Sequence, residues 1–276
     1  MIINCNGKLI DLRTPKIMGV LNITPDSFYD GGQYKNKDSI LNQTEKMISE
    51  GATFIDIGAY SSRPDADDIA VEEELNRLRP VLKLLNENFG DDILMSVDTF
   101  RSKVADFALN NNVAMINDIS GGLLDDNMLE IMGRHQKPYV LMHMKGNPQN
   151  MKELAVYEDV VLEVKQYFSE RVNLARQKGI SDIIIDPGFG FAKNITHNFD
   201  MLSKFQLFKS LELPILCGIS RKSMIYKTLN TTPQNALNGT TALHSIALSK
   251  GANILRVHDV KEAKECILLS EKLQNS

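Results

Sequence analysis

Eight short runs of apolar residues, spread along the chain, restrict its fold more than any other feature. They begin at Lys16, Thr53, Ile93, Ala114, Pro138, Asp182, Pro214 and Ile254. Each run is almost continuously apolar, which is typical of parallel strands buried on both faces. The segments between them have helical spacing of apolar residues, as in 40–50 and 71–88. Gly51 and Gly90 stand where these two helices should end.

Eight alternating strand and helix units in 276 residues predict a (β/α)8 TIM barrel, with residues 1–276 as a single domain. A doubly wound open sheet is the alternative. The barrel is favoured because eight units in this length suffice to close one. Residues 1–12 are expected to form a short N-terminal β-hairpin with Asn6-Gly7 as its turn, capping the N-terminal end of the barrel.

Composition narrows the class of partner. The formal net charge is −4, which argues against general nucleic-acid binding. No apolar run approaches membrane-spanning length and the first residues show no signal sequence. The cysteines Cys5, Cys217 and Cys266 have neither paired nor zinc-like spacing. We therefore predict a cytoplasmic protein with reduced thiols that acts on small molecules, without nucleic acid or membrane as a partner.

Polar residues stand at the end of every apolar run, where a core strand has no need of them. They are Asn22, Asp56, Ser61 to Arg63, Asp98, Asn117, Asp118, His143, Asp186, Ser220 to Lys222, Arg256, His258 and Asp259. In a barrel these positions converge at the C-terminal mouth, where barrel active sites are built. A structural role stays open for any single one, and is favoured for Asp56, Asp118 and Asp259. Coincidence does not explain the whole set.

The chemistry of these side chains indicates a ligand. Asp98, Asn117 and Asp186 accept hydrogen bonds and suit a flat heterocycle that bears amino and ring N–H groups. The basic residues Lys222, Arg256 and His258 suit carbonyl and phosphate oxygens. The sequence thus predicts a pocket for a polar ring plus anionic groups.

Other candidate motifs do not hold. Gly188-Phe189-Gly190 lacks the third glycine and the acidic residue of a dinucleotide fingerprint, and the chain has no P-loop. His135, His197 and His244 lie in helical or loop stretches, and we assign them to the surface or to packing.

A series of motifs in order along the chain resembles the dihydropteroate synthase family. It comprises Met18 to Phe28 with Asp30-Gly31-Gly32, then Asp56 to Pro64, Ser96 to Thr99, Ile116 to Gly121, Met142 to Met144, Asp186 to Phe191, Gly218 to Ser223 and Arg256 to Asp259. One such motif would be weak, but the ordered series covers nearly the whole chain. It also matches the strand ends chosen above on other grounds.

The resemblance implies an activity: transfer of a pterin from 6-hydroxymethyl-7,8-dihydropterin pyrophosphate to p-aminobenzoate, giving 7,8-dihydropteroate and pyrophosphate. It also implies Mg²⁺ as cofactor, a homodimer and inhibition by sulfonamides. The implied catalytic residues are Asp98, Asp186, Lys222 and Arg256. The pterin and pyrophosphate residues are Ser62, Arg63, Asp98, Asn117, Asp186, Lys222, Arg256 and His258. The p-aminobenzoate residues are Phe28, Ser62, Pro64, Lys222 and Ser223, and the metal ligand is Asn22.

Three positions depart from the pattern of the family. Asp65 and Ala192 stand where glycine is common, and Ser62 where threonine is common. None of them removes a pterin-holding group.

Two rival functions remain open. A pterin-dependent methyltransferase domain would share the barrel, but Thr24 to Gly32 and Ser220 to Ser223 suit pyrophosphate and an aryl acid better. A non-catalytic pterin-binding paralogue should have lost its leaving-group residues, whereas Asn22, Arg63, Arg256 and His258 are all present.

Overall fold

The barrel is formed by eight parallel strands. The computed structural model describes residues 1–23, 33–61 and 68–274. The strands within them are β3 (Lys16–Asn22), β4 (Phe54–Gly58), β5 (Leu94–Asp98), β6 (Met115–Asp118), β7 (Tyr139–Met142), β8 (Ile183–Asp186), β9 (Leu216–Cys217) and β10 (Ile254–Val257). They pair in the order β8-β7-β6-β5-β4-β3-β10-β9, and the bridge between Ile185 and Ile215 joins the two ends. The predicted barrel is confirmed, and the open sheet is wrong.

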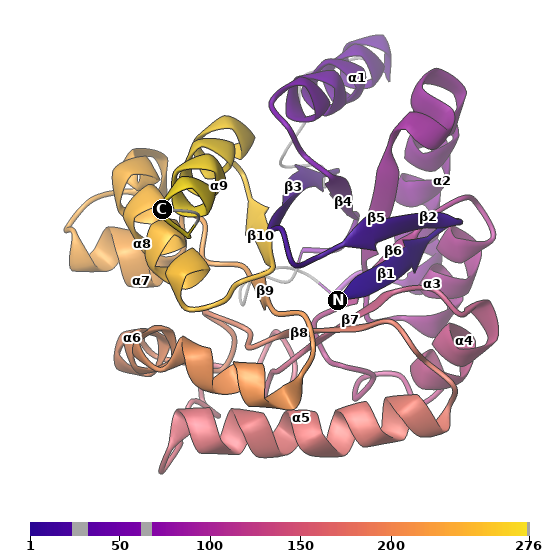
Figure 1. The fold of residues 1–276 in the computed structure, drawn as a ribbon. Coiled ribbons are helices and arrows are strands. Elements are labelled where there is room, and N and C mark those ends of the chain that lie inside the picture. Colours follow the sequence, from indigo (N-terminus) through magenta and orange to yellow (C-terminus); the bar gives the residue numbers. More distant parts are fainter. Residues whose placement is uncertain (24–32, 62–67, 275–276) are drawn as a thin grey trace.

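Helices surround the strands (Figure 1). They are α1 (Gln33–Ser49), α2 (Val71–Phe89), α3 (Ser102–Leu109), α4 (Met128–His135), α5 (Val160–Gln177), α6 (Ile195–Ser203), α7 (Ser223–Thr228), α8 (Leu237–Ser249) and α9 (Val260–Gln274), with 3-10 turns η2 (Gly90–Asp92), η3 (Phe205–Leu211) and η4 (Pro233–Asn235). The prediction for α2 was accurate. Helix α1 begins earlier than the sequence predicted. Residues 33–38 are too polar to show the helical spacing on which the prediction rested.

The N-terminal hairpin is present as predicted. Strands β1 (Ile2–Cys5) and β2 (Lys8–Asp11) pair antiparallel. Asn6 and Gly7 between them have φ values of 53° and 87°. Positive φ at both turn residues is the conformation that Asn-Gly favours in two-residue hairpins. Figure 1 shows the hairpin lying across one end of the barrel.

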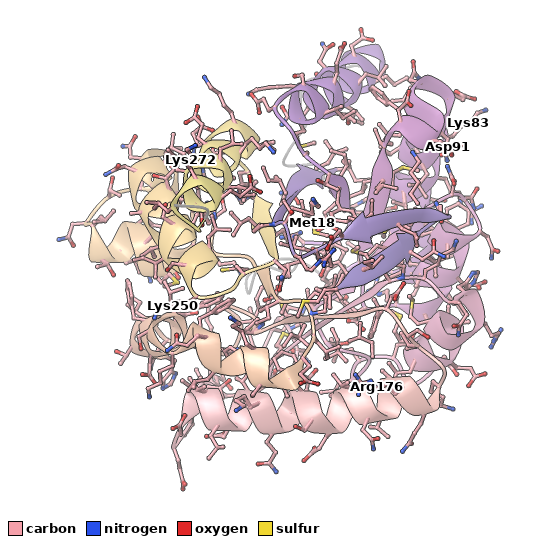
Figure 2. All side chains as sticks on the ribbon, in the orientation of Figure 1. Met18, Lys83, Asp91, Arg176, Lys250 and Lys272 are labelled. Carbon is pink, nitrogen blue, oxygen red and sulfur yellow. The ribbon has the colours of Figure 1, made fainter. Side chains whose placement is uncertain are left out.

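The hairpin closes the N-terminal end of the barrel with apolar side chains. Ile3, Cys5 and Leu12 form one buried cluster with residues of the barrel strands: Met18, Phe54, Leu94, Ala114, Met115, Val140, Ile184, Leu216 and Ile254. Figure 2 shows Met18 in the centre of the fold and labelled charged residues such as Lys83 and Arg176 at its outside. The hydrogen bond from Asn4 N to Asp182 Oδ2, 2.7 Å long, attaches the hairpin to the segment before β8.

A larger apolar cluster lies between the strands and the helices and includes Leu78, Leu82 and Leu85 of α2 with Ile55 and Ile57 of β4. All three cysteines are buried and free. Within the described ranges, none of the helices is both long and apolar enough to cross a membrane.

Candidate active site

Four neighbouring strands place a residue at or next to their C-terminal ends at one level of the mouth. Asn22 of β3 is paired in register with Gly58 of β4, Gly58 with Asp98 of β5, and Asp98 with Asn117 of β6. A side chain on Gly58 would meet Asn22 Oδ1, since a Cβ built there lies 3.1 Å from that atom. Among the described residues a Cβ there would meet no other atom within 4 Å, so the missing side chain leaves space beside the Asn22 amide.

A network of ion pairs and hydrogen bonds links this row to β10. Arg256 donates from Nε to Asp56 Oδ2 (2.7 Å) and from Nη2 to Asp98 Oδ2 (2.8 Å). Asn117 donates from Nδ2 to the same Asp56 oxygen, at 3.0 Å. Asp56 is fully buried. The sequence favoured a structural role for Asp56, and the structure shows which one: it orients two of the predicted site residues.

Burial strongly perturbs the acid of this network. It raises the pKa of Asp98 to about 7, an effect opposed by the nearby Arg256 guanidinium and reinforced by Asp56. The two carboxylates in turn hold the pKa of Arg256 above its ordinary value, although burial acts in the opposite direction. Perturbed titrating groups in a concave site are typical of functional positions.

Asp186 and Lys222 form the other half of the mouth. Asp186 ends β8 and accepts from Gly188 N (2.8 Å). Lys222 donates to the carbonyl oxygen of Phe189, and its Nζ lies 4.8 Å from the ring centre of Phe191. Burial raises the pKa of Asp186. Burial also lowers the pKa of Lys222 to about 8, opposed by the charge of Asp186. At pH 7 Lys222 is therefore still mostly protonated.

His258 follows β10 and bonds to Ser220. Ser220 Oγ accepts from His258 N (3.2 Å) and lies 3.1 Å from His258 Nδ1. If the Ser220 hydroxyl donates to Nδ1, the ring proton lies on Nε2. Desolvation of the ring, followed by the charge of Arg256, lowers the pKa of His258 to about 4, although the residue as a whole is exposed at the mouth. His258 is thus a neutral N–H donor at pH 7, not a cation.

Asp118 and Asp259 have structural roles, as expected. Asp118 accepts from Ser120 N (2.8 Å), Gly122 N (2.7 Å) and the hydroxyl of Tyr139 (2.6 Å). Asp259 receives two bonds of 2.7 Å from the Arg221 guanidinium, which also donates to the carbonyl oxygens of Pro233 and Gln234. Arg221 thus turns away from Lys222 and fixes the segment between α7 and α8.

The three helical histidines also match their assignment. His135 lies 2.7 Å from Asp106, His197 takes part in the capping box of α6, and His244 is buried in α8. What the sequence did not indicate is Lys193, which is buried beside His143. Its only sequence signal was a lysine at the end of a glycine-rich loop.

Several predicted residues cannot be placed. Phe28, Ser62, Arg63, Pro64 and the departure Asp65 lie outside the described residues. Ser223 is the first residue of α7, directly after Lys222. Helix α7 is short and spans only Ser223–Thr228.

The donor set at the mouth suits a hard cation held largely by a substrate. Over the described parts of the chain, there is no cluster of three or more His, Cys, Asp or Glu residues able to hold a metal ion. Asn22 offers one amide oxygen beside the gap at Gly58. Mg²⁺ commonly takes only one or two protein ligands and fills its remaining positions with water and substrate phosphates. The residues present therefore fit that ion.

The fold and the mouth together define a TIM-barrel enzyme whose site receives a polar ring and an anionic group. A family described as pterin binding enzyme matches residues 18–258. A dihydropteroate synthase of Escherichia coli (strain K12) is 42% identical over 267 residues, which cover 96% of this chain and 94% of that protein.

Two solved structures are similar over the whole chain. The dihydropteroate synthase of Yersinia pestis, in a complex with a sulfonamide drug, has a TM-score of 0.93 and 39% identity, with full coverage of both chains. The Xanthomonas albilineans enzyme with 4-aminobenzoic acid has a TM-score of 0.91 and 34% identity, covering 100% of this chain and 98% of the other. The chain belongs to the dihydropteroate synthase family of pterin-binding enzymes, which are transferases of folate biosynthesis.

Proposed function

We propose that this chain carries out the reaction of its family at the barrel mouth, with Asp98, Asn117, Asp186, Lys222 and Arg256 holding the pterin pyrophosphate. The observation that carries the assignment is the Asn117–Asp56–Arg256–Asp98 network opposite Asp186 and Lys222. It brings three carboxylates (Asp56, Asp98 and Asp186), the Asn117 amide and two cations, Arg256 and the partly buried Lys222, close to one another. We further propose that residues 1–276 act as one domain.

The pterin half of the substrate matches the acceptors. Asp98 and Asp186 are carboxylates that can receive the amino and ring N–H groups of a pterin, and Asn117 can both donate and accept. The Lys222 ammonium would bind the ring carbonyl or a ring nitrogen. Since Arg256 occupies Asp98 in the described structure, the pterin would share this carboxylate with the guanidinium.

The pyrophosphate half matches the donors. Arg256 and Arg63 would supply positive charge, and His258 a neutral Nε2–H bond. Asn22 would hold Mg²⁺, which when bound would supply charge stabilisation to the departing pyrophosphate. The p-aminobenzoate would lie between Phe28, Ser62, Pro64, Lys222 and Ser223, with Ser223 near its carboxylate. The complex of the Xanthomonas albilineans enzyme with 4-aminobenzoic acid supports this substrate class.

We also propose an SN1-like path. The carbon–oxygen bond to pyrophosphate breaks first, and the methylene cation is delocalised into the pterin ring, beside the Asp186 carboxylate. The amine of p-aminobenzoate then forms the carbon–nitrogen bond and releases a proton. Asp186 suits this role because a buried carboxylate stabilises a nearby cation more strongly than an exposed one would.

Positional isotope exchange tests this path. The pterin pyrophosphate is labelled with ¹⁸O at the oxygen that bridges the methylene carbon and the first phosphorus, and is incubated with enzyme and Mg²⁺ but without p-aminobenzoate. We expect the label to appear in non-bridging positions of recovered substrate. A label that stays in place, together with pyrophosphate release that requires the amine, would show a tight displacement instead.

The site assignment is tested by pyrophosphate release and dihydropteroate formation. We expect Asp186→Asn to reduce kcat/KM by at least about a hundredfold, because it loses the negative charge beside the developing cation. Asn117→Ala should reduce kcat/KM by at least about tenfold, because it loses one hydrogen-bonding contact to the pterin ring. A rate for both variants close to that of the parent would place the pterin elsewhere.

We propose a homodimer as the assembled form. Leu268, Leu269 and Leu273 of α9 are exposed by 52%, 69% and 79%. A subunit interface over this helix would remove their apolar surface from water. Sedimentation equilibrium would show a dimer, and a Leu269→Glu variant would shift it to monomer. A monomeric parent protein would refute the proposal.

A further inference from the structure

The loop from Pro187 to Lys193 contacts the side chain of Lys222. The carbonyl oxygen of Phe189 accepts from Lys222, the Phe191 ring lies under its ammonium, and a Cβ on Gly190 would come within 3.3 Å of its Cδ. The position of the Lys222 ammonium thus depends on the conformation of this loop.

The backbone of the loop is left-handed at three positions, one of which is not a glycine. Gly188, Gly190 and Ala192 have φ values of 71°, 83° and 48°, so every second residue is left-handed. Ala192 carries a Cβ that makes this region costly. Such a conformation persists only where contacts around it hold it in place.

Lys193 supplies those contacts from within the loop itself. Its side chain turns back underneath, and the residue is only 8% exposed. The ammonium donates to the carbonyl oxygens of Gly188 (3.1 Å) and Phe191 (3.0 Å), and to His143 Nδ1 (2.8 Å). A longer contact of 3.4 Å reaches the carbonyl oxygen of His143. Burial holds the pKa of Lys193 well below its ordinary value, opposed by the charge of Asp186, and when protonated the ammonium has acceptors for all three of its N–H bonds. Over the described ranges, no ion pair of 4.0 Å or less joins it to a carboxylate, so its function is not that of a salt bridge.

His143 connects this lysine to the barrel. It follows β7, its backbone N donates to the carbonyl oxygen of Asp186 (2.9 Å), and its ring packs edge-on against Tyr167 at 4.8 Å. A Cβ on Gly188 would come within 2.1 Å of the His143 carbonyl oxygen, so the loop is in close contact with it. Burial and the charge of Lys193 hold the pKa of His143 well below its ordinary value. The lowered pKa favours the neutral ring, and in the tautomer with its proton on Nε2 the Nδ1 atom accepts from the Lys193 ammonium.

We propose that His143 and Lys193 are positioning residues for pterin binding, acting through the 187–193 loop on Lys222. Neither needs to touch the substrate. The pair fixes the carbonyl of Phe189 and the ring of Phe191, and these fix the ammonium opposite Asp186. This inference rests on the role proposed above for Lys222 in holding the pterin.

The test measures the affinity for 6-hydroxymethylpterin by calorimetry and the KM for p-aminobenzoate in the same variants. We expect Lys193→Met and His143→Leu to weaken pterin binding by roughly tenfold or more. The KM for p-aminobenzoate should rise less than the pterin affinity falls, because Lys222 is only one of the residues proposed to hold that substrate. His143→Gln should retain most of the affinity, because its amide oxygen can replace Nδ1 as the acceptor.

A matched control separates positioning from general destabilisation. His135→Leu also removes a histidine that makes one bond of 2.7 Å, to Asp106 on the outer helices, and should leave pterin affinity unchanged. If Lys193→Met does not fold, Lys193→Arg carries the test, with weaker pterin binding expected at a nearly unchanged melting temperature.

Two results would overturn the inference. One is an unchanged pterin affinity in folded His143→Leu protein. The other is a loss of affinity for both substrates in proportion to the loss of stability. Lys222→Ala serves as the reference: if it binds pterin normally, the proposed role of Lys222 fails. If it alone loses binding, only the inference about His143 and Lys193 fails.

Discussion

The two ends of this barrel are built from the same strands but on opposite principles. At the N-terminal end, Phe54, Met18 and the hairpin residues Ile3 and Leu12 form an apolar cluster that is almost entirely buried. At the C-terminal end, the last residues of those strands are acids, amides and cations held together by a few hydrogen bonds. The N-terminal end stabilises the fold, whereas the C-terminal end lowers that stability by burying the polar groups of a binding site.

The largest expected effect is on the stability of the apolar end. Phe54→Ala removes a fully buried ring from the cluster under the hairpin and should lower the free energy of unfolding by about 3–5 kcal/mol. Denaturant titration measures the change. The rate per folded molecule should stay near that of the parent, because Phe54 lies at the end away from the mouth. Leu9→Ala, at a hairpin residue that is 71% exposed, is the control and should cost under about 0.5 kcal/mol.

The mouth should control the pH dependence of the rate. Asp98 must be ionised to accept a bond from the pterin, so kcat/KM should rise as the pH rises through the Asp98 pKa of about 7. Lys222 must be protonated, so kcat/KM should fall as the pH rises past the Lys222 pKa of about 8. A profile measured from pH 5 to 10 should therefore be bell-shaped. In Asp98→Asn, the residual kcat/KM should no longer fall at low pH. A fall at low pH that remained would be due to the titration of another group.

The same carboxyl should reduce stability. Its pKa is higher in the folded chain than in the unfolded chain, so the Asp98 contribution to stability is present at low pH and is lost as the pH rises through about 7. Asp98→Asn, which cannot ionise, should therefore be more stable than the parent at pH 8, by on the order of 1 kcal/mol, and gain less at pH 5. Urea titrations at the two pH values measure this. A variant that was less stable at pH 8 would mean that the pair with Arg256 outweighs the cost of burial.

The smallest expected effect compares two left-handed residues, one at each end. Ala192 at the mouth has φ 48°, and Gly7 in the hairpin has φ 87° with open space around a would-be Cβ. Ala192→Gly should stabilise the chain, and Gly7→Ala should destabilise it, each by about 0.5–1 kcal/mol. Calorimetric melting of the two variants measures both. Shifts of the same sign would show that backbone conformation does not set the difference.

The sequence predicted the two ends unequally well. Continuous apolar runs and the Asn-Gly turn were sufficient to predict the barrel and its hairpin. Burial on both faces of a strand and positive φ in a turn each restrict which residue types can occur. The family pattern and the strand ends also pointed to the residues that the structure brings together at the mouth: Asp98, Asn117, Asp186, Lys222 and Arg256.

Other features could not be predicted from the sequence. The orienting role of Asp56 depends on a guanidinium 200 positions away in the chain. The bond between Lys193 and His143 depends on how a loop folds back beneath itself, which leaves no periodic signal. The lowered pKa of His258 follows from desolvation of its ring and from the charge of Arg256, not from residue type. Contacts of this kind join residues that are far apart in the chain, and they form only in the folded barrel.

The central claim is that function at the mouth is separable from stability at the opposite end. Dihydropteroate formation by Lys222→Met, measured with its free energy of unfolding, tests it most directly. The account predicts that kcat/KM falls by at least about a hundredfold, since the cation opposite Asp186 is gone, while the free energy of unfolding stays within about 1 kcal/mol of the parent. Activity close to that of the parent, or a loss of activity matched by a loss of folded protein, would contradict it.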